Sequence, residues 1–196
     1  MNQSKHDLIV IGVVGRAGAG KDEVAEYLHG RCDGRYFSVG DIVRGIADKR
    51  GWEKTRSNLH AITEEFYHQK GEDYFIQRII DKIEERDTRL ATVAGIRSPQ
   101  DASILREHFG DRFLLVAVRV DGPHVRFERL RARDAPRDPE SFKTFLQQEQ
   151  EEEKRFHIDR TIERADLTLK NDASLEALHR AIETEIITDL LAGRCD

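Results

Sequence analysis

A glycine-rich loop near the start of the chain constrains the fold more than any other stretch. The loop runs from Gly15 to Lys21 with the spacing G-x-x-x-x-G-K, and Asp22 follows it directly. The apolar run 8–14 before the loop predicts a buried strand, and residues 21–32 predict a helix. Glycines let the backbone turn its N–H groups inward, and a helix N-terminus adds partial positive charge. The stretch therefore predicts a strand, an anion-binding loop and a helix, in that order.

The spacing is that of a Walker A loop, whose backbone cradles nucleotide phosphates while its lysine reaches the β- and γ-phosphates. The residues predicted to bind ATP are Gly15, Arg16, Ala17, Gly18, Ala19, Gly20, Lys21 and Asp22. Asp22 stands where Ser or Thr normally offers a hydroxyl to Mg²⁺. A carboxylate is also an oxygen ligand that Mg²⁺ accepts, so Asp22 is a candidate metal ligand. The alternative is that Asp22 is a helix-end residue favoured by the dipole, with its carboxylate in solvent.

Length and composition exclude several classes of protein. A chain of 196 residues with 38% hydrophobic and 35% charged residues suits one α/β domain. The net charge of −5 argues against a general nucleic-acid binder. No apolar run approaches the ~20 residues of a membrane span, and the short polar start shows no secretory signal. Cys32 and Cys195 are too few and too far apart in sequence to suggest a disulfide framework or a zinc site. We therefore expect a cytoplasmic monomer or homodimer in a reducing setting, with neither nucleic acid nor membrane as partner.

Four further apolar segments predict strands, at residues 36–39, 90–96, 113–120 and 167–169. They alternate with helical patterns, which predicts a five-stranded parallel sheet covered by helices on both faces, a three-layer α/β fold. We expect a core formed by residues 1–40, 88–133 and 157–196, a helical insert at about 41–87, and a short lid at about 134–156. Asp41, Thr55 and Ser98 are expected to cap helices. A stripe from Leu175 to Leu190 predicts a closing amphipathic helix.

Charged residues follow the ends of the second and third strands. Ligands of parallel α/β sheets bind beyond the carboxyl ends of the strands. Asp41 and Arg44 follow the second strand, and Arg44 suits a bidentate contact with an acceptor phosphate. Arg97 follows the third strand, next to Gly95, and is expected to point into the same crevice. The alternatives are a simple helix cap for Asp41, a surface position for Arg44 and an exposed loop position for Arg97.

A basic helix and an acidic helix follow the fourth strand. Arg126, Arg129 and Arg133 fall on one helical face that leads into a proline-broken segment. This arrangement suits a mobile lid that closes over phosphates. The alternative is a solvated basic face balanced by the acidic helix after it. Residues 147–153 contain hardly an apolar side chain, and we interpret them as a solvated helix face rather than a binding site.

Several stretches carry a family resemblance. Residues 39–44, V-G-D-I-V-R, resemble the T-G-D-[ML]-[LF]-R motif of adenylate kinases, and residues 95–97, G-I-R, resemble their D-G-x-P-R motif. Residues 129–133, R-L-R-A-R, resemble the R-L-x-x-R stretch that enters the lid. Residues 170–172, K-N-D, resemble the N-D-G-S loop near the donor adenine, and residues 20–22 resemble a G-K-D-T variant loop. The chain resembles nucleoside monophosphate kinases of the adenylate kinase and dephospho-CoA kinase kind, and most closely the dephospho-CoA-kinase-like proteins of archaea.

The resemblance implies an ATP- and Mg²⁺-dependent phosphotransferase whose acceptor already carries a phosphate. A nucleoside or deoxynucleoside monophosphate is the first choice of acceptor. Asp41, Arg44 and Arg97 fall on acceptor-binding positions. Lys21 and Arg133 would join Arg97 in stabilising the charge that develops during transfer.

On the donor side, the resemblance implies that Arg129 stacks on the base and that Asn171 lies near the adenine. Ala94 departs from the pattern, because adenylate kinases have an acidic residue before this glycine. Two alternatives follow. One is a dephospho-CoA-like kinase, with Asp41 as the base for a ribose hydroxyl. The other is a nucleotide-binding regulator with little kinase activity, which Ala94 favours.

Overall fold

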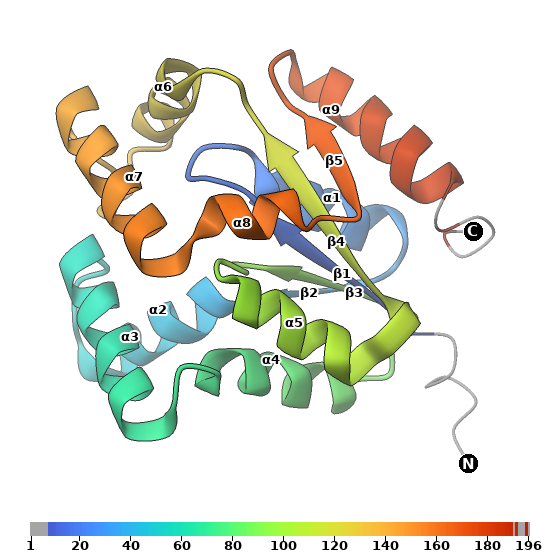
Figure 1. Ribbon diagram of the computed structural model, residues 1–196, viewed down its shortest axis with the longest axis horizontal. Helices are drawn as coiled ribbons and strands as arrows, with labels where there is room; N and C mark the ends of the chain where they lie inside the picture. Colours follow the sequence, from blue (N-terminus) through green and yellow to red (C-terminus); the bar gives the residue numbers. More distant parts are fainter. Residues whose placement is uncertain (1–7, 190, 192–194, 196) are drawn as a thin grey trace.

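The five strands form one parallel sheet, as predicted (Figure 1). The computed structural model describes residues 8–189, 191 and 195. The strands are β1 (Ile9–Val14), β2 (Arg35–Ser38), β3 (Leu90–Ala94), β4 (Phe113–Arg119) and β5 (Leu167–Lys170), in the order β2-β3-β1-β4-β5. Gly12 of the central strand lies opposite Val93 of β3 and Leu115 of β4. Strand β3 ends earlier than predicted because Gly95 adopts a φ of +87°, outside the strand region.

Helices cover both faces of the sheet, which confirms the three-layer fold (Figure 1). One face carries α4 (Tyr74–Glu84), α5 (Pro99–Phe109) and α8 (Ile158–Glu163), and a short 3₁₀ turn, Gly110–Arg112, leads from α5 into β4. The other face carries α1 (Lys21–Arg31) and α9 (Leu175–Ala181), which continues as a π-helix over Ile182–Thr188. Both layers bury apolar side chains against the strands, which stabilises the position of the strand ends.

The segment predicted as an insert divides into two parts. Helices α2 (Val39–Arg50) and α3 (Arg56–Lys70) share a small apolar core that includes Ile62 and Phe75. Helix α4 differs from the expected insert, because its isoleucines are at most 3% exposed and pack into the core under the sheet. Helix α4 is therefore part of the helical layer that covers this face of the sheet.

Helix ends follow the sequence with one exception. The hydroxyls of Thr55 and Ser98 accept backbone N–H groups at the starts of α3 and α5, as predicted. Asp41 does not cap α2. The hydroxyl of Ser38 does, accepting the N–H of Asp41 at 3.3 Å. The helix therefore begins three residues earlier than predicted, which places Asp41 in its first turn.

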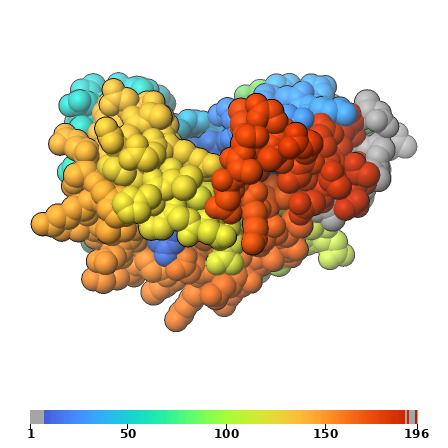
Figure 2. Space-filling model, turned by 90° about the horizontal axis from the view of Figure 1, so that it is seen from above, coloured from blue at the N-terminus to red at the C-terminus, as the bar shows by residue number. Residues whose placement is uncertain are grey.

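The predicted lid consists of a loop at residues 134–141 and helix α7 (Phe142–Phe156), which follows α6 (Pro123–Arg133). Phe145 of α7 is 1% exposed and packs with Phe127 and Leu130 of α6. Figure 2 shows this yellow and orange segment at one end of the molecule, with the red helix α9 toward the other. The start of α7 is therefore docked on α6.

The cysteines and the closing helix correct two expectations. Cys32 and Cys195 form a disulfide bond, with their Cα atoms 4.2 Å apart. Their separation of 163 residues in sequence hid the pairing, because the closing helix returns along α1 and brings the chain end to Cys32. The two cysteines therefore give no support for a reducing setting. Leu175 is 50% exposed and is not part of the buried stripe, and Leu190 lies outside the described residues. Within the described part of the chain, no helix is both long and apolar enough to cross a membrane.

Candidate functional site

The phosphate loop joins β1 to α1 and depends on its glycines. Gly18 and Gly20 have φ values of +76° and +93°, a region that other residues rarely adopt. A Cβ added to Gly18 would also lie 2.5 Å from the carbonyl oxygen of Arg126, so α6 packs directly against the loop. Lys21 is the first residue of α1, where the helix dipole favours an anion. The loop therefore has the backbone conformation of an anion cradle.

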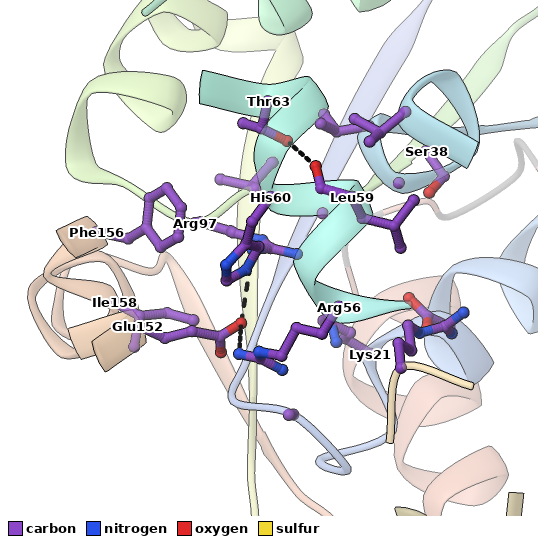
Figure 3. Close-up of a pocket in the computed structure, with 18 of the residues that line it drawn as sticks. Lys21, Ser38, Arg56, Leu59, His60, Thr63, Arg97, Glu152, Phe156 and Ile158 are labelled. Carbon is purple, nitrogen blue, oxygen red and sulfur yellow. Dashed lines mark hydrogen bonds and ion pairs between the residues drawn. The ribbon is translucent and has the colours of Figure 1, made fainter. Parts of the chain in front are cut away.

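One cavity extends from this loop to the helical insert and α7 (Figure 3). Its cationic lining residues are Lys21, Arg44, Arg56, Arg97, Arg133 and Arg137, and its carboxylates are Asp22, Asp101, Asp138 and Glu152. Six cationic side chains thus face four acidic ones, although the whole chain carries a net charge of −5. An excess of positive charge in a concave site attracts anionic ligands.

The structure brings the predicted residues Lys21, Asp22, Arg44, Arg97 and Arg133 to this cavity. The Nε atom of Arg133 donates to Asp138 at 2.8 Å, and this hydrogen bond is the main cause that raises the pKa of Arg133. Arg44 pairs with Asp41 at 2.5 Å.

Two contacts hold the loop that carries Arg97. Its backbone N–H donates to the carboxylate of Asp101 at 3.1 Å, and its carbonyl accepts the hydroxyl of Thr161 at 2.8 Å. Asp41, in contrast, is outside the set of residues that line the cavity, and its side chain is 58% exposed. Arg97 is therefore positioned from two helices, whereas Asp41 meets the site only through Arg44.

Three other predicted residues, Arg16, Arg129 and Asn171, are outside the set that lines the cavity. Arg16 donates to Asp159 of α8 at 2.9 Å. The Asn171 side chain donates to the carbonyl of Ala19 at 2.9 Å, and Arg129 donates to the carbonyl of Asn171 at 2.9 Å. These contacts brace the loop from the side opposite the cavity.

Arg126 does not face the cavity with Arg133, although the sequence predicted one arginine face for Arg126, Arg129 and Arg133. It is 6% exposed, donates to the carbonyl of Ala17 at 3.2 Å, and forms a bidentate pair with Glu149 of α7. The predicted face of three arginines is therefore divided, because only Arg133 reaches the cavity. The Arg126–Glu149 pair joins the phosphate loop to α7.

The acidic helix α7 overturns the interpretation of a solvated face. Glu152 pairs with Arg56 at 2.7 Å and with Arg97 at 3.5 Å, and its side chain is 13% exposed (Figure 3). Burial alone would raise the pKa of Glu152, but the charges of Arg97, Arg56 and Lys21 outweigh burial and lower it. The carboxylate is therefore ionised. The phenylalanines at 142, 145 and 156 were the signal in the sequence that one face of this helix is buried.

Helix α3 supplies lining residues that the sequence did not reveal. Burial and the nearby charges of Arg56 and Arg97 lower the pKa of His60 to about 4, so its ring is neutral at pH 7. Burial raises the pKa of Tyr67 to about 12. Thr63 lies between them on the same helix and also lines the cavity. This wall therefore offers neutral polar groups beside the arginines.

Sequence relatives cover almost the whole chain. A UPF0200 protein from Thermococcus onnurineus (strain NA1) is 31% identical over 187 residues, covering 94% of this chain and 99% of that protein. A UPF0200 protein from Hyperthermus butylicus is 33% identical over 171 residues, covering 87% and 89%. Residues 14–146 match the family model described as an AAA domain.

Solved structures share the fold at low identity. Shikimate kinase from Acinetobacter baumannii superposes with a TM-score of 0.58 and 17% identity, covering 95% of this chain and 99% of that one. A gluconokinase from Sinorhizobium meliloti 1021 gives 0.56 and 18%, covering 88% and 87%. The relatives, the domain match and this shared fold show that the chain belongs to the UPF0200 family, within the superfamily of P-loop proteins that resemble nucleoside monophosphate kinases.

Proposed function

We propose that this protein transfers the γ-phosphoryl group of ATP to a small acceptor that already carries a phosphate. A nucleoside or deoxynucleoside monophosphate is our first choice. The observation that carries the proposal is the convergence of cations from separate elements on one cavity. Lys21 begins α1, Arg44 lies on α2, Arg97 follows β3 and Arg133 ends α6. Two phosphate-bearing substrates supply the negative charge that such a cavity favours.

The phosphate loop suits the donor. Its inward backbone and Lys21 would hold the β- and γ-phosphates of ATP. Arg129 also lines a shallow apolar depression on α6, together with Val125 and Ala132. We assign this depression to the adenine, with the planar guanidinium of Arg129 stacking on the base. Asn171 links this depression to the loop through its contacts with Arg129 and Ala19.

Asp22 is the residue that would bind Mg²⁺. It lines the cavity directly after Lys21, and its charge acts on both Arg133 and Arg137. Across the described residues, no group of three or more His, Cys, Asp or Glu side chains could hold a metal ion. Asp22 would be the protein ligand, directly or through water, because its carboxylate lines the cavity beside the phosphate loop, and phosphate oxygens and waters would supply the other ligands. When bound, Mg²⁺ neutralises phosphate charge and fixes the geometry of the triphosphate.

Transfer needs positioning and charge stabilisation more than covalent chemistry. The bond from the γ-phosphorus to the β–γ bridging oxygen breaks, a bond to an acceptor oxygen forms, and ADP leaves. Lys21, Arg97 and Arg133 would stabilise the charge on the transferring group. A phosphate acceptor offers an oxygen that has already lost its proton, so no base is required. The hydroxyl-acceptor alternative needs a base, and Asp41 supports it less because its side chain is exposed and is outside the cavity lining.

Incubation with ATP, Mg²⁺ and a panel of acceptors tests the proposal. The panel contains nucleoside and deoxynucleoside monophosphates, dephospho-CoA, and the shikimate and gluconate suggested by the structural neighbours. ADP formed only in the presence of a monophosphate, and lost in Lys21→Ala, is the expected result. Transfer to dephospho-CoA, shikimate or gluconate would show that the acceptor is not a nucleoside monophosphate. ADP released at the same rate without any acceptor would show a nucleotide-hydrolysing regulator.

A further inference from the structure

Helix α7 supplies a carboxylate to the acceptor side of the cavity from outside the insert. Glu152 reaches across from α7 to Arg56, at the start of α3, and to Arg97, after β3 (Figure 3). Arg56 and Arg97 belong to different elements and are joined in this structure only through Glu152, as far as the described residues show. Two arginines on one carboxylate form the arrangement that also grips a phosphate.

The pair is incompletely satisfied. The Nε atom of Arg56 is buried and has no hydrogen-bond partner within the described residues. The longer of the two contacts, between Arg97 and Glu152, is an ion pair at 3.5 Å rather than a short hydrogen bond. A tetrahedral phosphate offers more acceptor oxygens than a carboxylate and can use donors that Glu152 leaves free.

We propose that Glu152 is an internal ligand that occupies the anion site of the acceptor and is displaced when the acceptor binds. The inference rests on the proposed function, because it identifies Arg56 and Arg97 as the acceptor's phosphate site. In the free protein, Glu152 holds Arg97 away from the donor phosphates. An anionic acceptor releases Arg97, whereas water cannot compete for it. Glu152 thereby favours transfer over hydrolysis.

The same helix face connects the acceptor site to the donor loop. Glu149 pairs with Arg126, which donates to the carbonyl of Ala17 in the loop. Glu153 pairs with Arg16 of the loop at 3.3 Å. Glu149, Glu152 and Glu153 thus lie within about one helical turn and contact both sides of the cavity. Release of Glu152 frees its carboxylate while α7 stays joined to α3 through Arg155 and Glu64 and to the phosphate loop through Glu149 and Glu153.

Binding of inorganic phosphate tests the inference without requiring turnover. Calorimetric titrations are made with ADP present to fill the donor loop. We expect Glu152→Gln to bind phosphate roughly tenfold more tightly than the parent, because an internal competitor has lost its charge. The gain has to disappear when Arg56→Ala is added to Glu152→Gln, which assigns the phosphate to this site, because Arg56 pairs with Glu152 and has no role at the transferring phosphate. Unchanged or weaker binding in Glu152→Gln would show that Glu152 is a structural brace and would overturn the inference.

Glu151→Gln is the matched control, because Glu151 is an exposed neighbour on the same helix and the change in net charge is identical. It should bind phosphate like the parent. If Glu152→Gln does not unfold cooperatively, Glu152→Asp keeps the charge but shortens the side chain, and a smaller gain of about two- to threefold is expected. Tighter phosphate binding with no turnover on any acceptor would retain the anion site and reject the proposed kinase. Turnover without any gain in phosphate binding would retain the proposed kinase and reject Glu152 as an internal ligand.

Discussion

Two groups of arginines flank the phosphate loop and have opposite surroundings. The cavity arginines, Arg44, Arg97 and Arg133, line a space that holds more cations than carboxylates. The loop-backing arginines, Arg16, Arg126 and Arg129, are joined to Glu149, Glu153, Asp159 or a backbone carbonyl behind the loop.

The difference between the two groups is one of location rather than of pairing. Each cavity arginine also has a carboxylate partner, Asp41, Glu152 or Asp138, but it lies beside a space whose surplus of cations a ligand can use, whereas the loop-backing arginines hold the loop to neighbouring parts of the fold. Helix α7 contacts both groups, because it supplies Glu149 and Glu153 to the loop-backing arginines and Glu152 to Arg97 of the cavity. The predictions below test this division, from the largest expected effect to the smallest.

Arg126→Ala should lower the free energy of unfolding by about 3 kcal/mol, because it leaves the buried carboxylate of Glu149 with only its longer ion pair to Arg16, at 3.8 Å. The pair is almost fully buried, at 7% and 12% side-chain exposure. Denaturant unfolding measures the loss. Arg131→Ala on the same helix is the control, because its pair with Glu128 is exposed and should contribute little. Equal losses in both variants would show that the buried pair of Arg126 stabilises the fold no more than an exposed surface pair.

Lys21→Ala should leave stability nearly unchanged and reduce kcat by about 10²–10³, the usual effect of removing one charged transition-state contact. Lys21 lines the cavity, and its charge is one of several that act on Glu152, where Arg97 and Arg56 contribute more, so the fold should depend little on it. Steady-state rates with the best acceptor provide the measurement. Activity within twofold of the parent would reject the phosphate-loop assignment.

Arg44→Ala should weaken acceptor binding by roughly 1.5–3 kcal/mol and ATP binding far less. Arg44 approaches the cavity from α2, on the acceptor side of the phosphate loop. Separate titrations of the two ligands give the comparison. Arg78→Ala removes a similar i,i+3 pair, with Asp81 on α4, and should change neither affinity. Equal losses of ATP and acceptor affinity would show that Arg44 contributes to the binding of both substrates.

His60 should make stability depend on pH. Its folded pKa of about 4 lies below the ordinary 6.5, so the unfolded chain binds more protons between these values and stability falls as the pH drops through this window. With allowance for partial solvent exposure, the parent should lose roughly 1–2 kcal/mol more than His60→Gln between pH 7 and pH 5. The exposed His68→Gln variant is the control and should follow the parent. Identical pH profiles for the parent and His60→Gln would contradict an electropositive cavity.

Substitution of Asp22 should have the smallest effect, a change in the Mg²⁺ concentration that turnover requires. Asp22→Ala should need more Mg²⁺ for half-maximal activity, and Asp22→Ser should recover part of the loss because a hydroxyl is the usual ligand. Titration of all three proteins with Mg²⁺ at fixed ATP makes the comparison. A common midpoint would make Asp22 a helix-end residue, with the metal held by phosphates and water.

The strand pattern and the glycine loop could be predicted because both depend on neighbours in sequence. Alternating apolar segments identified the five parallel strands, and G-x-x-x-x-G-K identified the anion cradle. Arg44 and Arg97 could be placed in one cavity because the carboxyl ends of parallel strands meet at one edge, and Arg133 because it ends the helix that leads into the predicted lid.

The features that the sequence did not predict depend on contacts between residues far apart in the chain. Nothing near Glu152 in the sequence shows that it faces Arg56, which lies 96 residues earlier. Arg126 shares a helix with Arg133, yet it packs against the phosphate loop because Gly18 lets the two backbones approach closely. The pairing of Cys32 with Cys195 likewise required the path of the last helix.

The disulfide bond also determines how the chain would respond to mechanical force. It closes residues 32–195 into a covalent ring, so tension applied to the two ends passes through the bond and bypasses everything between the cysteines. Only residues 1–32 and 196 carry the load, and they include the central strand β1 and the phosphate loop. Pulling would extend the oxidised chain by roughly 110 Å and the reduced chain by about 650 Å, at ~3.3 Å per residue. The nucleotide-binding segment is therefore the part of the oxidised molecule that stretching would open first.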